Sequence, residues 1–298
     1  MPLKATRLRT KRWRWHVQVE RNDFNSPGAM LSDSSYDIVL REDEDVYKED
    51  GTPLLKFRRQ VLDQNVCKVA YGNLRKAAAP TGNRGTAGGV KATKRLRVDG
   101  SVSNTTGSEK KINSGIVGYF DRYQRIPYCR QTSYSLKHPE RFQKAIPFFQ
   151  QVSEVFRTEL PERWQAQRDV IDKSSQAFYI PDTVFTTVTV NRNWQTAVHT
   201  DKGDLQEGFG CMSAFDGGMY DGCYLVFPAF RLAVDMRMGD VLLADVHEFH
   251  GSSPFKITGR YERVSCILYY RAGIKKCGTI DEEIERAKLH GAKINAEL

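Results

Sequence analysis

The stretch Asn191-Arg-Asn-Trp-Gln-Thr-Ala-Val-His-Thr-Asp-Lys-Gly-Asp204 has His199-Thr-Asp201 at its centre, and the other motifs of the chain are arranged around it. Alternate residues of a β-strand point to the same face, so this imidazole and this carboxylate can bind one metal ion together. The later stretch Gly239-Asp-Val-Leu-Leu-Ala-Asp-Val-His-Glu-Phe-His-Gly251 offers a second imidazole. Two histidines and one carboxylate on one side of a metal leave the opposite positions open, which is typical of non-haem Fe(II) oxygenases. The sequence therefore predicts iron-dependent oxidation chemistry.

Two histidines, His247 and His250, compete for the third ligand position. They would point to opposite faces if one strand continued through both. We favour His250, because it lies in His-Gly-Ser-Ser-Pro254, where the strand is expected to end. His247 would then support a ligand or contact the substrate.

A co-substrate site is predicted at Arg263-Val-Ser265, where Arg263 and Ser265 share one face of an expected strand. A guanidinium binds a carboxylate with a two-pronged geometry that lysine cannot reproduce. Arg263 is therefore the natural partner for the distal carboxylate of 2-oxoglutarate, with Arg260 as the alternative. The alternative to this functional role is that Arg263 only forms a surface ion pair, with Glu262 or Asp245.

The composition indicates a globular protein with one large domain or two modest ones. The 298 residues are 40% hydrophobic, which is enough for a sizeable core. No apolar run is long enough for a membrane span, and no apolar segment follows the basic N-terminus as in a secretory signal. The cysteines form no Cys-x-x-Cys pair, so we expect reduced thiols in an intracellular protein and no zinc cluster. They are Cys67, Cys129, Cys211, Cys223, Cys266 and Cys277.

The charge balance favours a polyanionic partner such as nucleic acid. The chain has 45 Lys and Arg against 36 Asp and Glu, a net charge of +9. Residues 1–14 are basic and contain no acid, with Trp13 inside the run and Trp15 just after it. This segment is either an arm that lies on a phosphate backbone, a nuclear-localisation-like run, or a solvated tail.

Three parts follow from the distribution of residue types. Residues 1–76 are expected to form a basic arm and an extension packed on the core, including a helix over 54–73. Residues 77–115 are rich in glycine and basic residues, which predicts a flexible loop that either contacts DNA backbone or has no role. Residues 116–298 are expected to form the core.

Within this core, helices are expected over 138–158, with Pro147 kinking or dividing the first, over 161–173, and at 279–298. Short strands are expected between the second and third helices, over 184–190, 224–227, 232–236, 241–244 and 264–270. Helices followed by many short strands favour an α+β fold with helices packed on a pair of antiparallel sheets or a barrel.

The ordered motifs resemble the TET/J-binding-protein family of Fe(II)- and 2-oxoglutarate-dependent nucleic-acid-base dioxygenases, most strongly the J-binding-protein-like, fungal and algal members. The resemblance covers about 115–271 and includes Asn193-x-x-Thr-Ala-x-His-Thr-Asp-Lys-Gly-Asp204, Gly222-Cys-Tyr-Leu-Val-Phe-Pro228, the 239–251 stretch and Arg263-x-Ser265. Tyr128-Cys-Arg-Gln-Thr132 resembles the segment that these enzymes place at the lip of the active site.

This resemblance implies a double-stranded β-helix (jelly-roll, cupin-like) core with buttressing helices. It implies that His199, Asp201 and His250 bind Fe(II), and that Arg263 with Ser265 binds 2-oxoglutarate, which reacts with O2. Asp204 and Asn193 would line the base pocket, since a carboxylate can accept from cytosine N4 and an amide can pair with a base edge. Aromatic and basic residues would hold the nucleic-acid strand, namely Tyr119, Tyr128, Arg130 and Tyr134.

The implied reaction is hydroxylation of the C5-methyl group of 5-methylcytosine in flipped-out DNA, to 5-hydroxymethylcytosine and further oxidised bases, in the nucleus. Thymine is the second candidate base. Algal relatives use ascorbate as co-substrate, which is an alternative to 2-oxoglutarate here. An oxygenase of the same fold acting on RNA, a protein side chain or a small molecule, and a non-catalytic jelly-roll binding module, are the remaining alternatives. No membrane partner is expected, and the oligomeric state is left open.

Overall fold

A computed structural model describes residues 5–9, 15–82, 84–89, 95–96, 102–103 and 112–296. The basic arm predicted over 1–14 is described only as the strand β1 (Ala5–Arg9), and its other residues lie outside the described part. Most of 90–111, the centre of the predicted flexible loop, also lies outside it.

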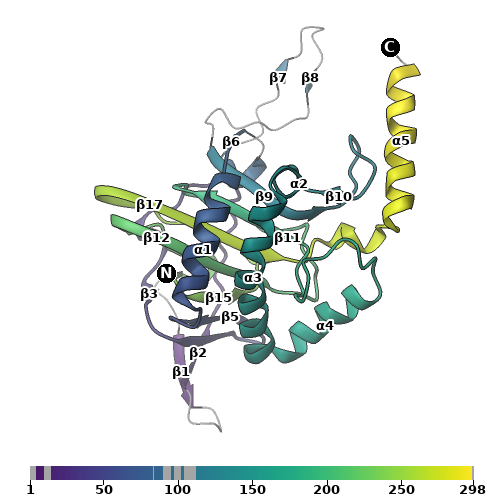
Figure 1. The fold of residues 1–298 in the computed structure, drawn as a ribbon. Helices are drawn as coiled ribbons and strands as arrows, with labels where there is room; N and C mark the ends of the chain where they lie inside the picture. Colours follow the sequence, from purple (N-terminus) through teal and green to yellow (C-terminus); the bar gives the residue numbers. More distant parts are fainter. Residues whose placement is uncertain are drawn as a thin grey trace.

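Two β-sheets form the body of the molecule (Figure 1). The major sheet has the strand order β1, β2 (Trp15–Val19), β4 (Glu44–Lys48), β5 (Pro53–Arg58), β15 (Val241–Ala244), β12 (Gly210–Gly222), β17 (Phe255–Tyr269), β11 (Thr187–Arg192), β9 (Ile112–Phe120) and β10 (Arg130–Gln131), with β6 (Pro80–Thr81) paired to β9. The minor sheet has the order β16 (Gly251–Ser252), β13 (Leu225–Phe227), β14 (Leu232–Val234) and β3 (Ile38–Leu40), and β7 (Arg95–Leu96) pairs with β8 (Val102–Ser103).

The described helices are α1 (Gln64–Leu74), α2 (Ser133–Lys137), α3 (Pro139–Glu159), α4 (Pro161–Asp172) and α5 (Ile280–Ala296). Of these, α1 and α3 cover one face of the major sheet. Figure 1 shows α1 and α3 lying side by side across the strands, while α5 projects from one end of the body. Apolar side chains of α1 and α3, such as Leu74 and Phe149, share one buried cluster with the sheet. The prediction of an α+β jelly-roll fold with buttressing helices is thus confirmed.

The central strand β17 lies between the helical layer and the space between the sheets, and its side chains point alternately to one and to the other. Val264, Cys266 and Leu268 are fully buried in the cluster under the helices. The intervening residues, from Arg263 to Tyr269, point to the opposite face. One strand therefore supplies both core packing and polar side chains between the sheets.

The residues before 77 are part of the sheets rather than an addition to them. β5 pairs with β15, and β3 pairs in parallel with β14. The helix predicted over 54–73 is wrong in its first part, because Leu54, Leu55 and Phe57 belong to the buried strand β5. Only the second part becomes α1, which starts where the Asp63 carboxylate accepts the backbone N–H groups of Asn65 and Val66.

Two further elements differ from expectation. α3 runs unbroken through Pro147, so the predicted division does not occur. The strand β12 was not predicted at all, because its sequence Gly-Cys-Met-Ser-Ala-Phe-Asp-Gly-Gly-Met-Tyr-Asp-Gly is rich in glycine and aspartate, which usually mark turns. Pairing with β15 and β17 on both sides supplies the hydrogen bonds that local propensity does not favour.

The prediction of six reduced thiols is wrong for Cys129 and Cys277, which form a disulfide with a Cα–Cα distance of 5.7 Å. The two residues lie 148 positions apart, so their spacing in the chain gave no indication of pairing. Among the described residues, Cys67, Cys211, Cys223 and Cys266 are free and buried. None of the described helices is long and apolar enough to cross a membrane.

Glu283 anchors α5 beside this disulfide, with only 3% of its surface exposed. Its carboxylate accepts hydrogen bonds from the Arg122 side chain and from the backbone N–H groups of Cys129 and Gly278. Burial alone would raise the pKa of Glu283, but these hydrogen bonds outweigh it and the pKa is lowered from its ordinary 4.5. The ionised carboxylate therefore stabilises the folded state.

We expect Glu283→Gln to lower the free energy of unfolding at pH 7 by about 2 kcal/mol, because hydrogen bonds to a charged acceptor are lost. A depressed folded-state pKa contributes stability above the unfolded pKa, and this contribution disappears as the pH falls through the folded value. In urea unfolding, the difference in free energy of unfolding between the variant and the parent should thus become smaller below about pH 4.5. Glu285→Gln, on the exposed face of the same helix, is the matched control. An unchanged difference down to pH 3 would contradict this role.

Candidate active site

A pocket of about 400 Å³ lies between the two sheets, a volume within the range of small-molecule sites. Its walls come from the inward faces of β11, β12, β13 and β17, from the 199–204 turn, and from residues 84–87. His199, Asp201 and His250 all line it.

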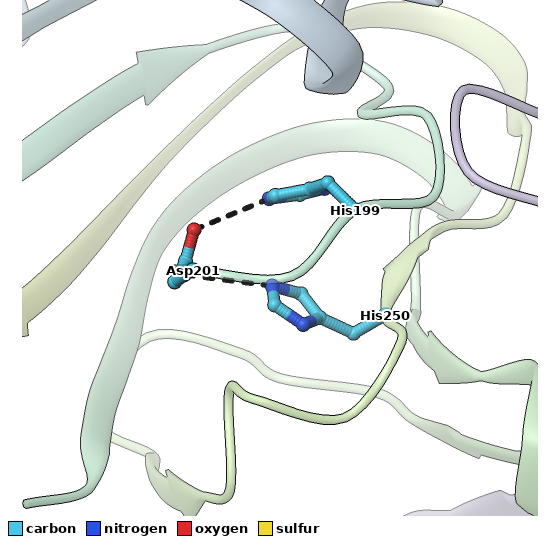
Figure 2. Close-up of side chains that lie close together, drawn as sticks. All are labelled: His199, Asp201 and His250. Carbon is cyan, nitrogen blue, oxygen red and sulfur yellow. Dashed lines mark ion pairs between the residues drawn. The ribbon is translucent and has the colours of Figure 1, made fainter. Parts of the chain in front are cut away.

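These three side chains point toward one another, with the Asp201 carboxylate facing both imidazoles (Figure 2). The His199 Nε2 atom lies 3.7 Å from one carboxylate oxygen, and the His250 Nε2 atom lies 3.6 Å from the other. One ligand atom from each residue can be chosen so that all three lie within 4.8 Å of one another. The sequence-predicted triad is therefore brought together, with His250 rather than His247 as its distal member.

Backbone hydrogen bonds fix this geometry. His199 and His250 exchange two of them, with N···O distances of 2.9 and 3.0 Å, and the Asp201 N–H donates to the Val246 carbonyl at 3.0 Å. The Nδ1 atoms of His199 and His250 lie 2.8 and 3.0 Å from the carbonyls of Ala197 and Glu248. Donation from Nδ1 leaves Nε2 with a lone pair aimed at the centre of the triad, as in known metal sites.

The pKa values of His199 and Asp201 also suit a metal ion. Burial, and then the charge of His250, lower the pKa of His199 to about 4. Burial would raise the pKa of Asp201, but its hydrogen bond with His250 and the charges of the neighbouring histidines together outweigh this and the pKa is lowered. A neutral imidazole and an ionised carboxylate are the forms that bind metals. The donor set of two imidazole nitrogens and one carboxylate on one side fits Fe(II) with open positions toward the pocket.

Arg263 and Ser265 line the same pocket from β17. Arg263 is only 7% exposed, and no carboxylate among the described residues pairs with it. The predicted structural alternative, an ion pair with Glu262 or Asp245, is not found: Glu262 pairs with Arg75, and Asp245 pairs with Lys48. Arg260, the alternative clamp, is exposed and lies outside the pocket lining.

Asp204 also reaches the pocket, next to Tyr269. Its Oδ2 atom is buried without a hydrogen-bond partner in the described part of the chain. Burial, and then the charge of Asp201, raise the pKa of Asp204 well above its usual range. A buried carboxyl oxygen without a partner is costly unless a ligand supplies one.

Other predicted substrate contacts lie outside the pocket. Asn193 is exposed, and its Oδ1 accepts the backbone N–H of Arg263 at 2.7 Å, so it holds β17 rather than a base. His247 lies in the turn before His250, where its Nδ1 is 3.3 Å from Asp245. The two histidines differ in direction because the chain turns between them instead of continuing as a strand.

No residue of the 128–132 segment lines the pocket. Arg130 lies over the rings of Phe120 and Tyr123, and Tyr128 is next to His290. Arg271 stacks on Phe120 and does reach the pocket. Tyr119 and Tyr134 make internal contacts, Tyr119 with Phe142 and Phe178, and Tyr134 with the Asn73 carbonyl. The predicted strand-holding residues Tyr119, Tyr128, Arg130 and Tyr134 therefore lie outside the pocket lining.

Sequence reasoning missed several pocket residues. Arg84, Thr86 and Ala87 come from the range predicted to be a flexible loop, and part of that range is the 3-10 helix η3 (Gly85–Gly88). Tyr269 and Asn191 were missed as well. Tyr269 lies four residues after the predicted Ser265, and Asn191 lies two residues before the predicted Asn193. Period-two alternation from Arg263 would have found Tyr269. No local signal marks Arg84.

The fold and the triad together define a double-stranded β-helix protein with a non-haem iron type of metal site. More specifically, residues 115–272 match the Tet_JBP family, described as the oxygenase domain of the 2OGFeDO superfamily. This match covers more than half of the chain, and the chain belongs to this family. The predictions of a dioxygenase that uses Fe(II), 2-oxoglutarate and O2 are confirmed at this level.

Named relatives are similar over the same region. The thymine dioxygenase JBP1 of Leishmania braziliensis is 37% identical over 167 residues, which is 54% of this chain and 20% of that protein. The thymine dioxygenase JBP1 of Crithidia fasciculata is 33% identical over 222 residues, which is 72% of this chain and 24% of that protein. The chain thus spans about a fifth to a quarter of the length of these relatives.

Among solved structures, NgTET1 in complex with 5mC DNA superposes with a TM-score of 0.58 at 13% identity, over 84% of this chain and 86% of that one. This similarity concerns the fold, and it extends beyond the 115–272 match into the N-terminal strands.

Proposed function

We propose that this protein is a DNA dioxygenase that hydroxylates the C5-methyl group of 5-methylcytosine. The observation that carries the proposal is one pocket with three converging metal-binding side chains and, on another wall, a buried guanidinium without a carboxylate partner. The names of the relatives and of the similar structure support a nucleic-acid base as substrate.

The residues of the chain would divide the work as follows. His199, Asp201 and His250 would hold Fe(II), and Arg263 with Ser265 would hold the distal carboxylate of 2-oxoglutarate. When bound, the iron supplies the oxidation in which O2 converts 2-oxoglutarate to succinate and CO2 and places its second oxygen into a methyl C–H bond. Asp204 would orient the base, because its unpartnered oxygen can accept from the cytosine N4 amino group.

A methyl group inside a duplex cannot reach the triad, which is buried between two sheets. We therefore infer that the base is flipped out of the helix, at a cost of a few kcal/mol. The excess of basic residues favours binding of the DNA backbone, and this binding should weaken with rising salt.

Thymine hydroxylation is the second candidate, because the similar relatives are named thymine dioxygenases. Thymine also carries a C5-methyl group, but it presents an acceptor, O4, where cytosine presents an amino group. The two bases therefore make opposite demands on Asp204.

The deciding experiment incubates the protein with Fe(II), 2-oxoglutarate and duplex DNA that contains 5-methylcytosine, followed by digestion to nucleosides and mass spectrometry. We expect the gain of one oxygen on 5-methyldeoxycytidine. Gain on thymidine alone would replace the proposal by the second candidate. Parallel reactions with methylated RNA, and with ascorbate in place of 2-oxoglutarate, test the other substrates and the other co-substrate. No oxidised nucleoside in any reaction would refute a nucleic-acid base as substrate.

We expect Asp204→Asn to lower kcat/KM for 5-methylcytosine about 10-fold to 100-fold, the range of one good base contact. Oxidation of thymine should fall less, because an amide N–H can donate to O4. Competition between the two bases in one oligonucleotide measures the ratio directly. Asp182→Asn is the matched control, an exposed aspartate outside the pocket whose φ of 57° asparagine tolerates. If the ratio of 5-methylcytosine oxidation to thymine oxidation is the same in the variant and the parent, Asp204 does not recognise the base.

A further inference from the structure

Arg84 is a cation in the pocket that the proposed function has not used. It lines the pocket together with His199, Asp201 and Tyr269. Its Nε atom is buried and has no hydrogen-bond partner, and no described carboxylate forms an ion pair with it. Burial lowers the pKa of Arg84, partly offset by the charges of Tyr269 and Asp201. An uncompensated buried cation is costly to the folded state.

Of the three arginines that line the pocket, only Arg271 has a carboxylate partner among the described residues. Arg271 pairs with Asp121 and stacks on Phe120. Asp201 is the carboxylate whose charge acts on the pKa of Arg84. It already interacts with both imidazoles of the triad. Within the described residues, the half-buried Arg84 and the buried Arg263 are therefore the two arginines that line the pocket without a carboxylate partner.

The backbone holds Arg84 in a defined place relative to the triad. The Ala87 carbonyl accepts the N–H of Ala197, two residues before His199, at 2.9 Å. Gly89 ends η3 with a φ of 77°, and an added Cβ there would lie 3.2 Å from the Met30 sulfur and 3.7 Å from the Ala197 Cβ. Residues 84–89, which we name the strap, are thus packed against the segment that leads into the metal-binding motif.

We propose that Arg84 is an oxyanion-binding residue of the active site, which the strap supplies from outside the 115–272 region that matches the family. This inference rests on the proposed function, because its ligand is either the second carboxylate of the co-substrate or a phosphate of the flipped nucleotide. Both sources present the same oxyanion chemistry to a guanidinium. Because the strap is hydrogen-bonded to Ala197, two residues before His199, the anion is expected at the metal end of the pocket, while Arg263 holds the other end.

The test measures binding without turnover, using Zn(II) in place of Fe(II). Titration calorimetry gives the affinity for 2-oxoglutarate, and fluorescence anisotropy gives the affinity for a methylated oligonucleotide without co-substrate. We expect Arg84→Met to weaken one of the two by at least about tenfold, the usual loss for a charge-assisted hydrogen bond. The affected ligand identifies the source of the oxyanion. Arg157→Met, which removes an exposed arginine of α3, should change neither by more than about twofold.

Thermal unfolding separates this role from a structural one. Without ligand, Arg84→Met should melt at the same temperature as the parent or higher, because an unpaired buried charge is removed. Arg84→Gln, which keeps hydrogen-bonding groups but no charge, should show the same binding loss and a similar melting temperature. Unchanged affinity for both ligands, or a melting temperature lowered by several degrees in both variants, would overturn the inference. Absence of turnover on every DNA, with the binding loss intact, would refute the proposed function alone.

Discussion

His250→Ala should lose stoichiometric Fe(II) binding and reduce turnover about a thousandfold or more, because two remaining ligands cannot hold the metal in an open three-ligand site. The side chain is 2% exposed, and its Nδ1 is held 3.0 Å from a carbonyl, so no neighbouring group can replace it. The readouts are metal content after dialysis and succinate release coupled to base oxidation.

His247→Ala is the matched control for this prediction. The two histidines are three residues apart, yet His247 faces Asp245 rather than the triad. We expect the His247 variant to keep its metal content and most of its turnover. The reverse result, with metal lost in the His247 variant and retained in the His250 variant, would show that the triad is wrongly assigned. Loss of metal in neither variant would argue against an iron site in this pocket.

Arg263→Lys should raise the KM for 2-oxoglutarate about 10-fold to 100-fold, with a smaller effect on kcat, because lysine keeps the charge but cannot bind both oxygens of a carboxylate. Calorimetric titration of the Zn(II)-loaded protein measures the same loss without turnover. Arg260→Lys, on the exposed part of β17, is the matched control and should leave both values unchanged.

Three results of this experiment are informative. A higher KM in Arg263→Lys alone supports the clamp. A higher KM in the Arg260 variant alone would move the clamp to that residue. Unchanged affinity in both would mean that the pocket does not use 2-oxoglutarate, in which case turnover with ascorbate becomes the decisive measurement.

Much of the fold followed from local patterns. The helix over 161–173 and the strand over 241–244 agree closely with α4 and β15, because apolar periodicity and capping residues are local signals. β5 and β12 were not predicted, because β5 has a mixed pattern that also suits a helix, and β12 is rich in turn-forming residues. Both depend on pairing with strands far away in the chain, which no local window contains.

The pairing of Cys129 with Cys277 shows the same limit for a covalent bond. Its two cysteines are separated by most of the core, and they meet because the 121–132 segment and the start of α5 both pack around Glu283. The cysteines are scattered along the sequence, which favoured free thiols, but the fold brings two of them together.

The sequence by itself determined the chemistry of the site. His199 and Asp201 are two residues apart, and His250 follows an apolar strand, so the order of residues predicts a converging set, with His247 as the competitor for the third position. The types of the ligand residues and the short spacing of His199 and Asp201 are local properties, which a stretch of sequence can show. Only the tertiary structure decided what surrounds them: that Arg84 and not Arg130 reaches the pocket, that Asn193 holds backbone instead of a base, and that the N-terminal strands complete both sheets. These outcomes depend on which distant segments pair across the sheets, and that choice is made by the packing of the whole chain rather than by any one stretch.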